Sequence, residues 1–164
     1  MLQGRMTFAP ALKINNMHNW FECKIKYEKN AGDGKILNVG EIYLVDAMSF
    51  TEAEARIIEE MRPFISGDFK VENIKRARIY EMFPNAAGDK WYRCRVMFIS
   101  LDEEKGVEKR TAAAIYVQAS DIKNAWDILQ DGMKGSMADY EVAAIVETAI
   151  MDVYSYKVDS KTDN

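Results

Sequence analysis

The residues from Tyr43 to Met61 have a recognisable second copy from Ile115 to Met133, 72 positions further along the chain. Two further pairs of segments repeat at a spacing of 71 residues: WFECKIKY at 20–27 with WYRCRVMF at 91–98, and the segment 67–83 with 138–154. Similarity at one nearly constant spacing in three successive segments indicates an internal duplication. A chain with this pattern is expected to fold as two related units.

Each copy of the repeated segment is predicted to begin as a strand and continue as a helix. In the first copy, Tyr43, Val45 and Ala47 alternate with Leu44 and Asp46, which is the period of a strand with one face on a core. The second copy has Ile115, Val117 and Ala119 at the corresponding positions.

A capping pattern and an apolar stripe predict the helix. Ser49 with Glu52 three residues later is typical of a capping box, and Asp121 takes the place of the capping serine in the second copy. Pro63 ends the first helix. The stripe that should face a core consists of Phe50, Ala53, Ile57, Ile58 and Met61 in the first copy and Ile122, Ala125, Leu129 and Met133 in the second.

Each half is therefore predicted to be a β-β-α-β unit. In the first half, strands at 20–27 and 41–47 form a hairpin, the helix follows, and 69–83 supplies the third strand. Because such crossovers are right-handed, the third strand should run parallel to the second, in the order 2-1-3. The predicted fold class is α+β, a tandem duplication with a mixed sheet and one helix per repeat. The second half follows the same plan, with strands at 91–100, 112–119 and 138–154.

The repeats divide the chain into five parts. These are a loose N-terminal extension at 1–16, the first repeat at 17–83, a linker at 84–90, the second repeat at 91–154 and a frayed tail at 155–164. One such unit leaves a large sheet face opposite its lone helix, so the two are expected to pack about an approximate two-fold axis.

Composition excludes several classes of protein. The chain has 164 residues, of which 48% are apolar and 29% charged, and its net charge is −4. These values fit one compact domain or two small units that share a core, and they do not fit a disordered chain. No apolar run is long enough to span a bilayer, and the FAPALKI segment is too short for a signal peptide, so we expect a cytoplasmic protein.

No motif for catalysis or cofactor binding is present in the sequence. It lacks a phosphate-binding loop, a dinucleotide glycine fingerprint, a serine-centred elbow and a histidine pair for metal. Cys23 and Cys94 alternate with apolar residues and are interpreted as buried thiols. A redox pair or metal site would need further ligands, and the only histidine is His18. We therefore expect no enzyme, no metal and no cofactor.

The sheet face opposite the first helix suggests a function. Alternation places Trp20, Glu22, Lys24 and Lys26 outward, and on the third strand it places Arg76, Arg78, Tyr80 and Met82 outward. Cations that follow phosphates, interleaved with rings that stack on bases, are typical of proteins that bind single strands. The sequence thus predicts a non-enzymatic nucleic-acid-binding protein, with single-stranded DNA as its first candidate ligand. The proposed contacts are Trp20 and Tyr80 on bases and Lys24, Lys26, Arg76 and Arg78 on phosphates.

The corresponding face of the second half is more apolar and favours an alternative. Its outward positions are Trp91, Arg93, Arg95, Met97 and Tyr116, followed by Glu147, Ala149, Met151 and Val153. An apolar face of this size usually marks an interface with a protein partner or with another copy of the chain. The alternative function is therefore an interaction module that modulates a protein partner. Its candidate interface residues are Trp91, Met97, Tyr116 and Met151.

The strings WFECK, YLVDAMSFTEAEARIIEEM, IKRA and GSMADYEVAAIVETAIMDVY resemble a family of domains of unknown function, the one numbered four-four-nine-four. The resemblance covers Met17 to about Tyr156, and the residues before Met17 depart from the family pattern. Because the family is found in gut Bacteroidales and their phages, the resemblance implies a bacterial or phage protein inside the cell. It transfers no catalytic residue, since the family has no established activity.

Overall fold

The computed structural model of the protein describes residues 19–156. Its elements are β1 (Asn19–Asn30), β2 (Ile36–Ala47), α2 (Phe50–Met61), β3 (Phe69–Ala77), β4 (Glu81–Phe83), β5 (Lys90–Asp102), β6 (Val107–Ala119), α3 (Ile122–Met133), β7 (Asp139–Glu147) and β8 (Ile150–Tyr154). The extension expected at 1–16 and residues 157–164 of the expected tail lie outside the described residues.

The described strands form two four-stranded sheets. The first sheet has the order β3-β1-β2-β8 and the second sheet has the order β4-β6-β5-β7. Each sheet is built on an antiparallel hairpin, β1–β2 or β5–β6, with β3 or β7 antiparallel to the first strand of that hairpin. The mixed α+β class is therefore confirmed, and β3 and β7 lie where the third strand was expected.

The fourth strand of each sheet comes from the other half of the chain. β4 pairs in parallel with β6, and β8 pairs in parallel with β2. The expectation that 69–83 and 138–154 each stay in the sheet of their own half is therefore wrong. Each stretch breaks into a nine-residue strand and a shorter strand that joins the other sheet. A sheet of one half alone, with three strands, is not what the chain builds.

This exchange defines two compact units. The first unit contains residues 19–77 and 150–156, and the second unit contains residues 78–149. The expected repeats, 17–83 and 91–154, cross these boundaries because the last strand of each lies in the other unit. The linker expected at 84–90 belongs to the second unit. There the Gln118 side chain accepts a hydrogen bond from the Asn85 N–H and donates one to the Gly88 carbonyl, both at 3.0 Å.

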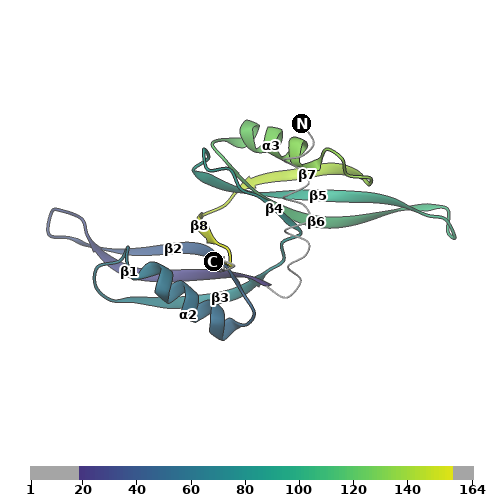
Figure 1. Cartoon of the computed structure of the whole chain (residues 1–164). Helices are drawn as coiled ribbons and strands as arrows, with labels where there is room; N and C mark the ends of the chain where they lie inside the picture. The colour runs from purple at the N-terminus through teal and green to yellow at the C-terminus, as the bar shows by residue number, and fades with distance from the viewer. Residues whose placement is uncertain (1–18, 157–164) are drawn as a thin grey trace, which may run out of the picture. The chain divides into compact units, whose positions relative to one another are not determined.

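In the first unit, α2 packs on one face of the sheet (Figure 1). Ser49 caps the helix, since its Oγ accepts a hydrogen bond from the Glu52 N–H at 3.1 Å. The buried stripe of the helix is Ala53, Ile57 and Met61. It meets the helix-facing residues of the hairpin, which are Phe21, Cys23, Ile25, Tyr43, Val45 and Ala47.

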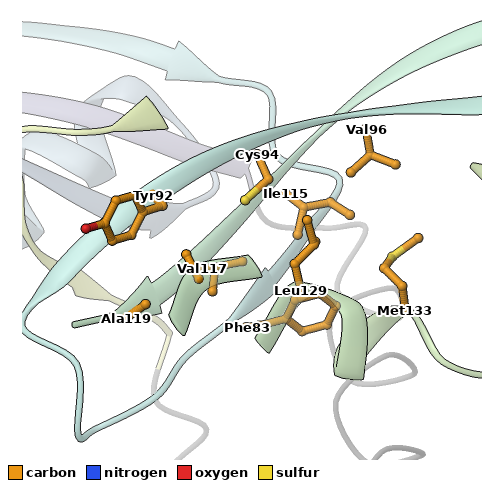
Figure 2. Packing of buried hydrophobic residues seen from close by; sticks show 10 residues of the cluster. Phe83, Tyr92, Cys94, Val96, Ile115, Val117, Ala119, Leu129 and Met133 are labelled. Carbon is orange, nitrogen blue, oxygen red and sulfur yellow. The ribbon is translucent and has the colours of Figure 1, made fainter. Parts of the chain in front are cut away.

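The core of the second unit includes a side chain from the exchanged strand β4 (Figure 2). Phe83 lies against α3 at Gly132, where an added Cβ would come within 2.6 Å of the Phe83 ring. Only glycine leaves room for this ring, so the helix is shaped to receive the exchanged strand. The stripe of α3, formed by Ala125, Leu129 and Met133, completes the core.

Arg56 of α2 holds the exchanged strand β8 in the first unit. Its guanidinium donates hydrogen bonds to the backbone carbonyl of Asp46, near the end of β2, and to that of Ser155, just after β8, at 3.2 Å for the latter. The Arg56 Cζ also lies 5.1 Å from the centre of the Tyr156 ring, within the range of a cation–π contact. The Arg56 side chain thus connects α2 with both β2 and the end of β8.

Two details of the predicted strand and stripes differ from the structure. Phe50 and Ile122, at the start of each helix, are 47% and 57% exposed. The Phe50 ring meets the Phe21 ring edge-on at 4.9 Å, and the Arg76 Cζ lies 5.8 Å from the centre of the Phe50 ring. Conversely, Leu44 and Asp46, on the sheet face away from the helix, are buried.

The buried stripes predict the effect of core substitutions. Ile57→Ala and Leu129→Ala should each lower the free energy of unfolding by about 2–5 kcal/mol, because each leaves a cavity among fully buried side chains. Urea unfolding followed by circular dichroism measures this. Glu59→Ala on the exposed side of α2 is the control and should stay within about 0.5 kcal/mol of the wild type. Equal unfolding midpoints for all the proteins would contradict the placement of the stripes.

Candidate functional site

The cations expected on the first sheet are paired with carboxylates. We call the sheet face away from the helix the open face. Lys24 and Lys26 lie there with the half-buried Trp20, and both lysines contact Glu72, with Nζ–Oε distances of 3.5 and 2.7 Å. The hydrogen bond from Lys26 lowers the pKa of the Glu72 carboxyl. Glu22 is paired with Lys75 at 3.1 Å. The carboxylates of Glu22 and Glu72 therefore offset part of the positive charge on the open face of the first sheet, where Lys70 also lies opposite Lys26.

The other three predicted contacts do not join Lys24 on this face. Arg76 is opposite Phe21 on the helix side, and its Cζ lies 5.8 Å from the centres of the Phe21 and Phe50 rings. The reason is a register shift in β3 at Glu72, because one extra residue reverses the alternation that follows it. The expectation of one shared row is thus wrong, although the binding roles themselves stay predictions.

Arg78 and Tyr80 belong to the second unit. The Tyr80 N–H donates a hydrogen bond to the Ala114 carbonyl at 2.8 Å, and its ring lies 5.2 Å from the ring of Phe98. Met82, expected on the same row, is buried in β4 beside Tyr116 of β6. The segment that was expected to extend the first sheet therefore crosses to the second one.

The open face of the second sheet carries two free arginines. Arg93 and Arg95 of β5 are exposed, and neither makes an ion pair with any residue that the structure describes. They point away from the helix because Tyr92, Cys94 and Val96, which alternate with them, are in the core. Small side chains surround Arg95, since Ala114 of β6 and Ala144 of β7 are its neighbours across the sheet.

Comparison of the two sheets explains why these arginines are unpaired. Lys24 and Arg95 occupy corresponding positions 71 residues apart, and so do Glu22 and Arg93. The second sheet has a register shift at the corresponding place, but there Ala143 takes the position of Glu72. In the second sheet, Arg93 takes the place of the carboxylate of Glu22, and the methyl group of Ala143 takes the place of the carboxylate of Glu72. This substitution pattern is visible in the aligned halves and is the sequence signal for the site.

The remaining carboxylates of this face lie further along the hairpin. The Arg110 guanidinium donates two hydrogen bonds to the Glu141 carboxylate, with N–O distances of 2.7 and 3.4 Å. Asp139 is opposite Ile99, four residues along β5 from Arg95, which corresponds to about 13 Å at the usual rise of a strand. The positive charge of the arginine pair is therefore locally uncompensated.

The predicted interface residues are divided between the units. Trp91, Met97 and Tyr116 share the open face of the second sheet, but Trp91 and Tyr116 are only 4% and 7% exposed. Met151 is 57% exposed and lies in β8, in the first unit. Glu147 and Val153, expected outward with them, are also separated, because Glu147 ends β7 on the Tyr92 side and Val153 belongs to the first sheet.

Cys23 and Cys94 are buried, as the sequence predicts. Burial raises the pKa of Cys23 to about 12, with a smaller effect from Glu22, and burial raises the pKa of Cys94 to about 11. Both thiols are free and fully buried, one in each core. In the part of the chain that the structure describes, no three His, Cys, Asp or Glu side chains gather closely enough to hold a metal ion.

These pKa values predict slow thiol chemistry in the native protein. At pH 8 both thiols should stay protonated and react with Ellman's reagent far more slowly than in the guanidinium-denatured chain, because the thiolate is the reactive form. The folded state favours the protonated thiols, so their contribution to stability is complete below the unfolded pKa of 9.0 and is lost as the pH rises toward 11–12. Native thiols that react at the rate of the denatured chain would contradict their burial.

Among the described residues, neither helix is long and apolar enough to cross a membrane.

The chain was compared with known proteins and families. No curated protein matches the sequence. A family model described as "Domain of unknown function (DUF4494)" matches residues 19–156, which is most of the chain and includes every element of both sheets. The family resemblance of the sequence strings is thereby confirmed, and the chain belongs to the DUF4494 family.

Proposed function

We propose that the protein is a non-enzymatic binding protein for single-stranded nucleic acid, and that the strand lies across the open face of the second sheet. A bacterial or phage-infected cytoplasm, the setting implied by the family resemblance, supplies such strands. The observation that supports this proposal is the pair of exposed arginines, Arg93 and Arg95, without carboxylate partners among the described residues. The proposal keeps the ligand expected from the sequence and moves its site to the other sheet.

The geometry of the arginine pair suits a phosphate backbone. Only Cys94 lies between Arg93 and Arg95 on a regular strand, so the Cα atoms of the two arginines are about 6.7 Å apart and both side chains leave the same face. Guanidinium groups bind phosphate oxygens through two parallel hydrogen bonds. The small neighbours Ala114 and Ala144 leave room for a backbone to approach Arg95.

Base recognition on this face must be weak. Its two aromatic rings, Trp91 and Tyr116, are buried, so base stacking can use only the planar guanidinium groups. Binding should therefore depend little on sequence and strongly on salt, because release of counterions from the phosphates dominates it. The net charge of −4 is compatible with this mode, since the positive charge is local.

Substitutions that give the second sheet the carboxylates of the first sheet test the proposal. Arg93→Glu with Ala143→Glu gives the second sheet the carboxylate pattern that the first sheet carries at Glu22 and Glu72. This double variant should lower the affinity for a fluorescein-labelled oligo-dT strand at least about tenfold, or about 1.4 kcal/mol. The slope of log affinity against log salt should also fall by about 0.7 for each phosphate contact that is lost. Fluorescence anisotropy at low salt measures both.

The first sheet supplies the matched controls. Lys24→Ala should leave binding unchanged, because Lys24 is already paired with Glu72. The reciprocal variant, Glu22→Arg with Glu72→Ala, should increase the affinity by creating a second cationic face. Absence of binding at micromolar wild-type protein would refute a nucleic-acid ligand. Loss of binding in Lys24→Ala alone would place the site on the first sheet, and tighter binding of an oligo-glutamate peptide would identify an acidic protein as the partner.

A further inference from the structure

The first unit contains a groove of about 1040 Å³ at the far end of the β1–β2 hairpin. β1 extends beyond β3 at this end: Tyr27 is its last residue that pairs with β3, opposite Phe69, whereas β1 continues to Asn30. The connection after α2, residues 64–68, forms the opposite wall. The groove therefore lies in the line that β3 would follow if it were longer.

The edge of β1 at the groove is available for pairing. From Glu28 to Asn30 the strand is paired with β2 on one side, and no described strand pairs with it on the other. Backbone groups of an antiparallel strand point alternately to its two neighbours, so this overhang directs unpaired N–H and C=O groups into the groove. Such an edge is a template for a further strand.

The walls of the groove suit a peptide better than a charged polymer. Phe64 is 76% exposed and Ile36 is 61% exposed, and both line the groove. Apart from Lys26, which is bound to Glu72, the lining charges are two lysines, Lys29 and Lys70, and two carboxylates, Glu28 and Asp68. With these signs balanced, the groove has no net attraction for phosphates and complements a partner of low net charge.

A partly buried network of hydrogen bonds holds Tyr27, a residue of the groove wall. The hydroxyl of Tyr27, which lines the groove, donates a hydrogen bond to Glu41 at 2.8 Å, and the Tyr43 hydroxyl donates another at 2.5 Å. The hydrogen bond to Glu41 raises the pKa of Tyr27. The corresponding residues of the second unit are the apolar Phe98, Ala113 and Ile115, so the fold itself does not need this network.

We infer that this groove binds a short extended peptide of a protein partner, which pairs with the β1 overhang as an additional strand. The partner segment is uncharged and carries β-branched side chains, which pack on Phe64 and Ile36. The overhang of about three residues spans about 10 Å, so backbone pairing alone is brief and the apolar wall supplies the rest of the contact. The site is separate from the arginine pair and does not depend on nucleic-acid binding.

The test uses the full chain and a defined probe, the fluorescein-labelled peptide acetyl-Val-Thr-Val-Thr-Val-amide. The same peptide with an N-methyl group on every residue keeps its side chains but has no backbone N–H to donate from either edge. We expect the unmodified peptide to bind at least about tenfold more tightly. Hydrogen exchange of the amides at 28–30 should slow when it binds. Equal binding of the two peptides would overturn strand pairing.

Matched substitutions locate the site. Phe64→Gly and Ile36→Ala should each weaken binding several-fold, because each removes an apolar side chain from the groove wall. Both positions are exposed, so the fold should be retained. Leu37→Ala is the control, because Leu37 is equally part of the hairpin and 51% exposed but does not line the groove. The inference is wrong if Leu37→Ala weakens binding as much as Phe64→Gly.

Two competition experiments separate this site from other occupants. Oligo-dT should not displace the peptide. The double variant Arg93→Glu with Ala143→Glu should bind the peptide as tightly as the wild type does. Displacement by oligo-dT would make the groove a nucleic-acid site and overturn the peptide assignment. Binding only to a chain that lacks residues 1–16 would identify a segment of this chain as the occupant and would equally contradict a partner peptide.

Discussion

The parallel pairings of β8 with β2 and of β4 with β6 complete the two sheets of the protein. Each sheet is completed by a strand from the other half of the chain, so neither half can form its four-stranded sheet alone. Phe83 against Gly132 and Arg56 against Ser155 hold the exchanged strands with specific contacts. Each exchanged strand is hydrogen-bonded into the sheet that it enters, so each unit contains a strand from both halves of the chain.

Exchange also explains how two similar sheets can acquire different surfaces. The open faces contribute little to the core on the helix side of either sheet. The charged residues on these faces can therefore differ between the two sheets. The first sheet pairs its lysines with Glu22 and Glu72, whereas the second sheet has Arg93 and Ala143 at those positions. A similar divergence separates the Tyr27–Glu41 network from its apolar counterpart. These differences between related positions are the best guide to function in a chain without a catalytic motif.

Local signals in the sequence predicted the local structure well. The caps at Ser49 and Asp121, the helix bounds and the hairpins follow from side-chain chemistry within a few residues. The exchange could not be predicted, because residues 78–80 and 148–149 carry no strong turn signal and the choice of sheet depends on distant partners. The register shift at Glu72 was equally invisible, and it moved Arg76 to the helix side. The outward orientation of Arg93 and Arg95 was predicted from the sequence. That these arginines lack carboxylate partners, unlike the lysines at the corresponding positions, is apparent only from the ion pairs of the first sheet.

We propose that a nucleic-acid strand binds Arg93 and Arg95. A titration of the ¹⁵N-labelled full chain with oligo-dT, followed by two-dimensional NMR, tests it most directly, because it reports each backbone amide and each arginine Nε–H. We expect the largest shift changes at Arg93 and Arg95 and at their cross-strand neighbours Ala114 and Ala144. Changes confined to Lys24, Lys26 and the rest of the first sheet, or no saturable changes at all, would contradict it.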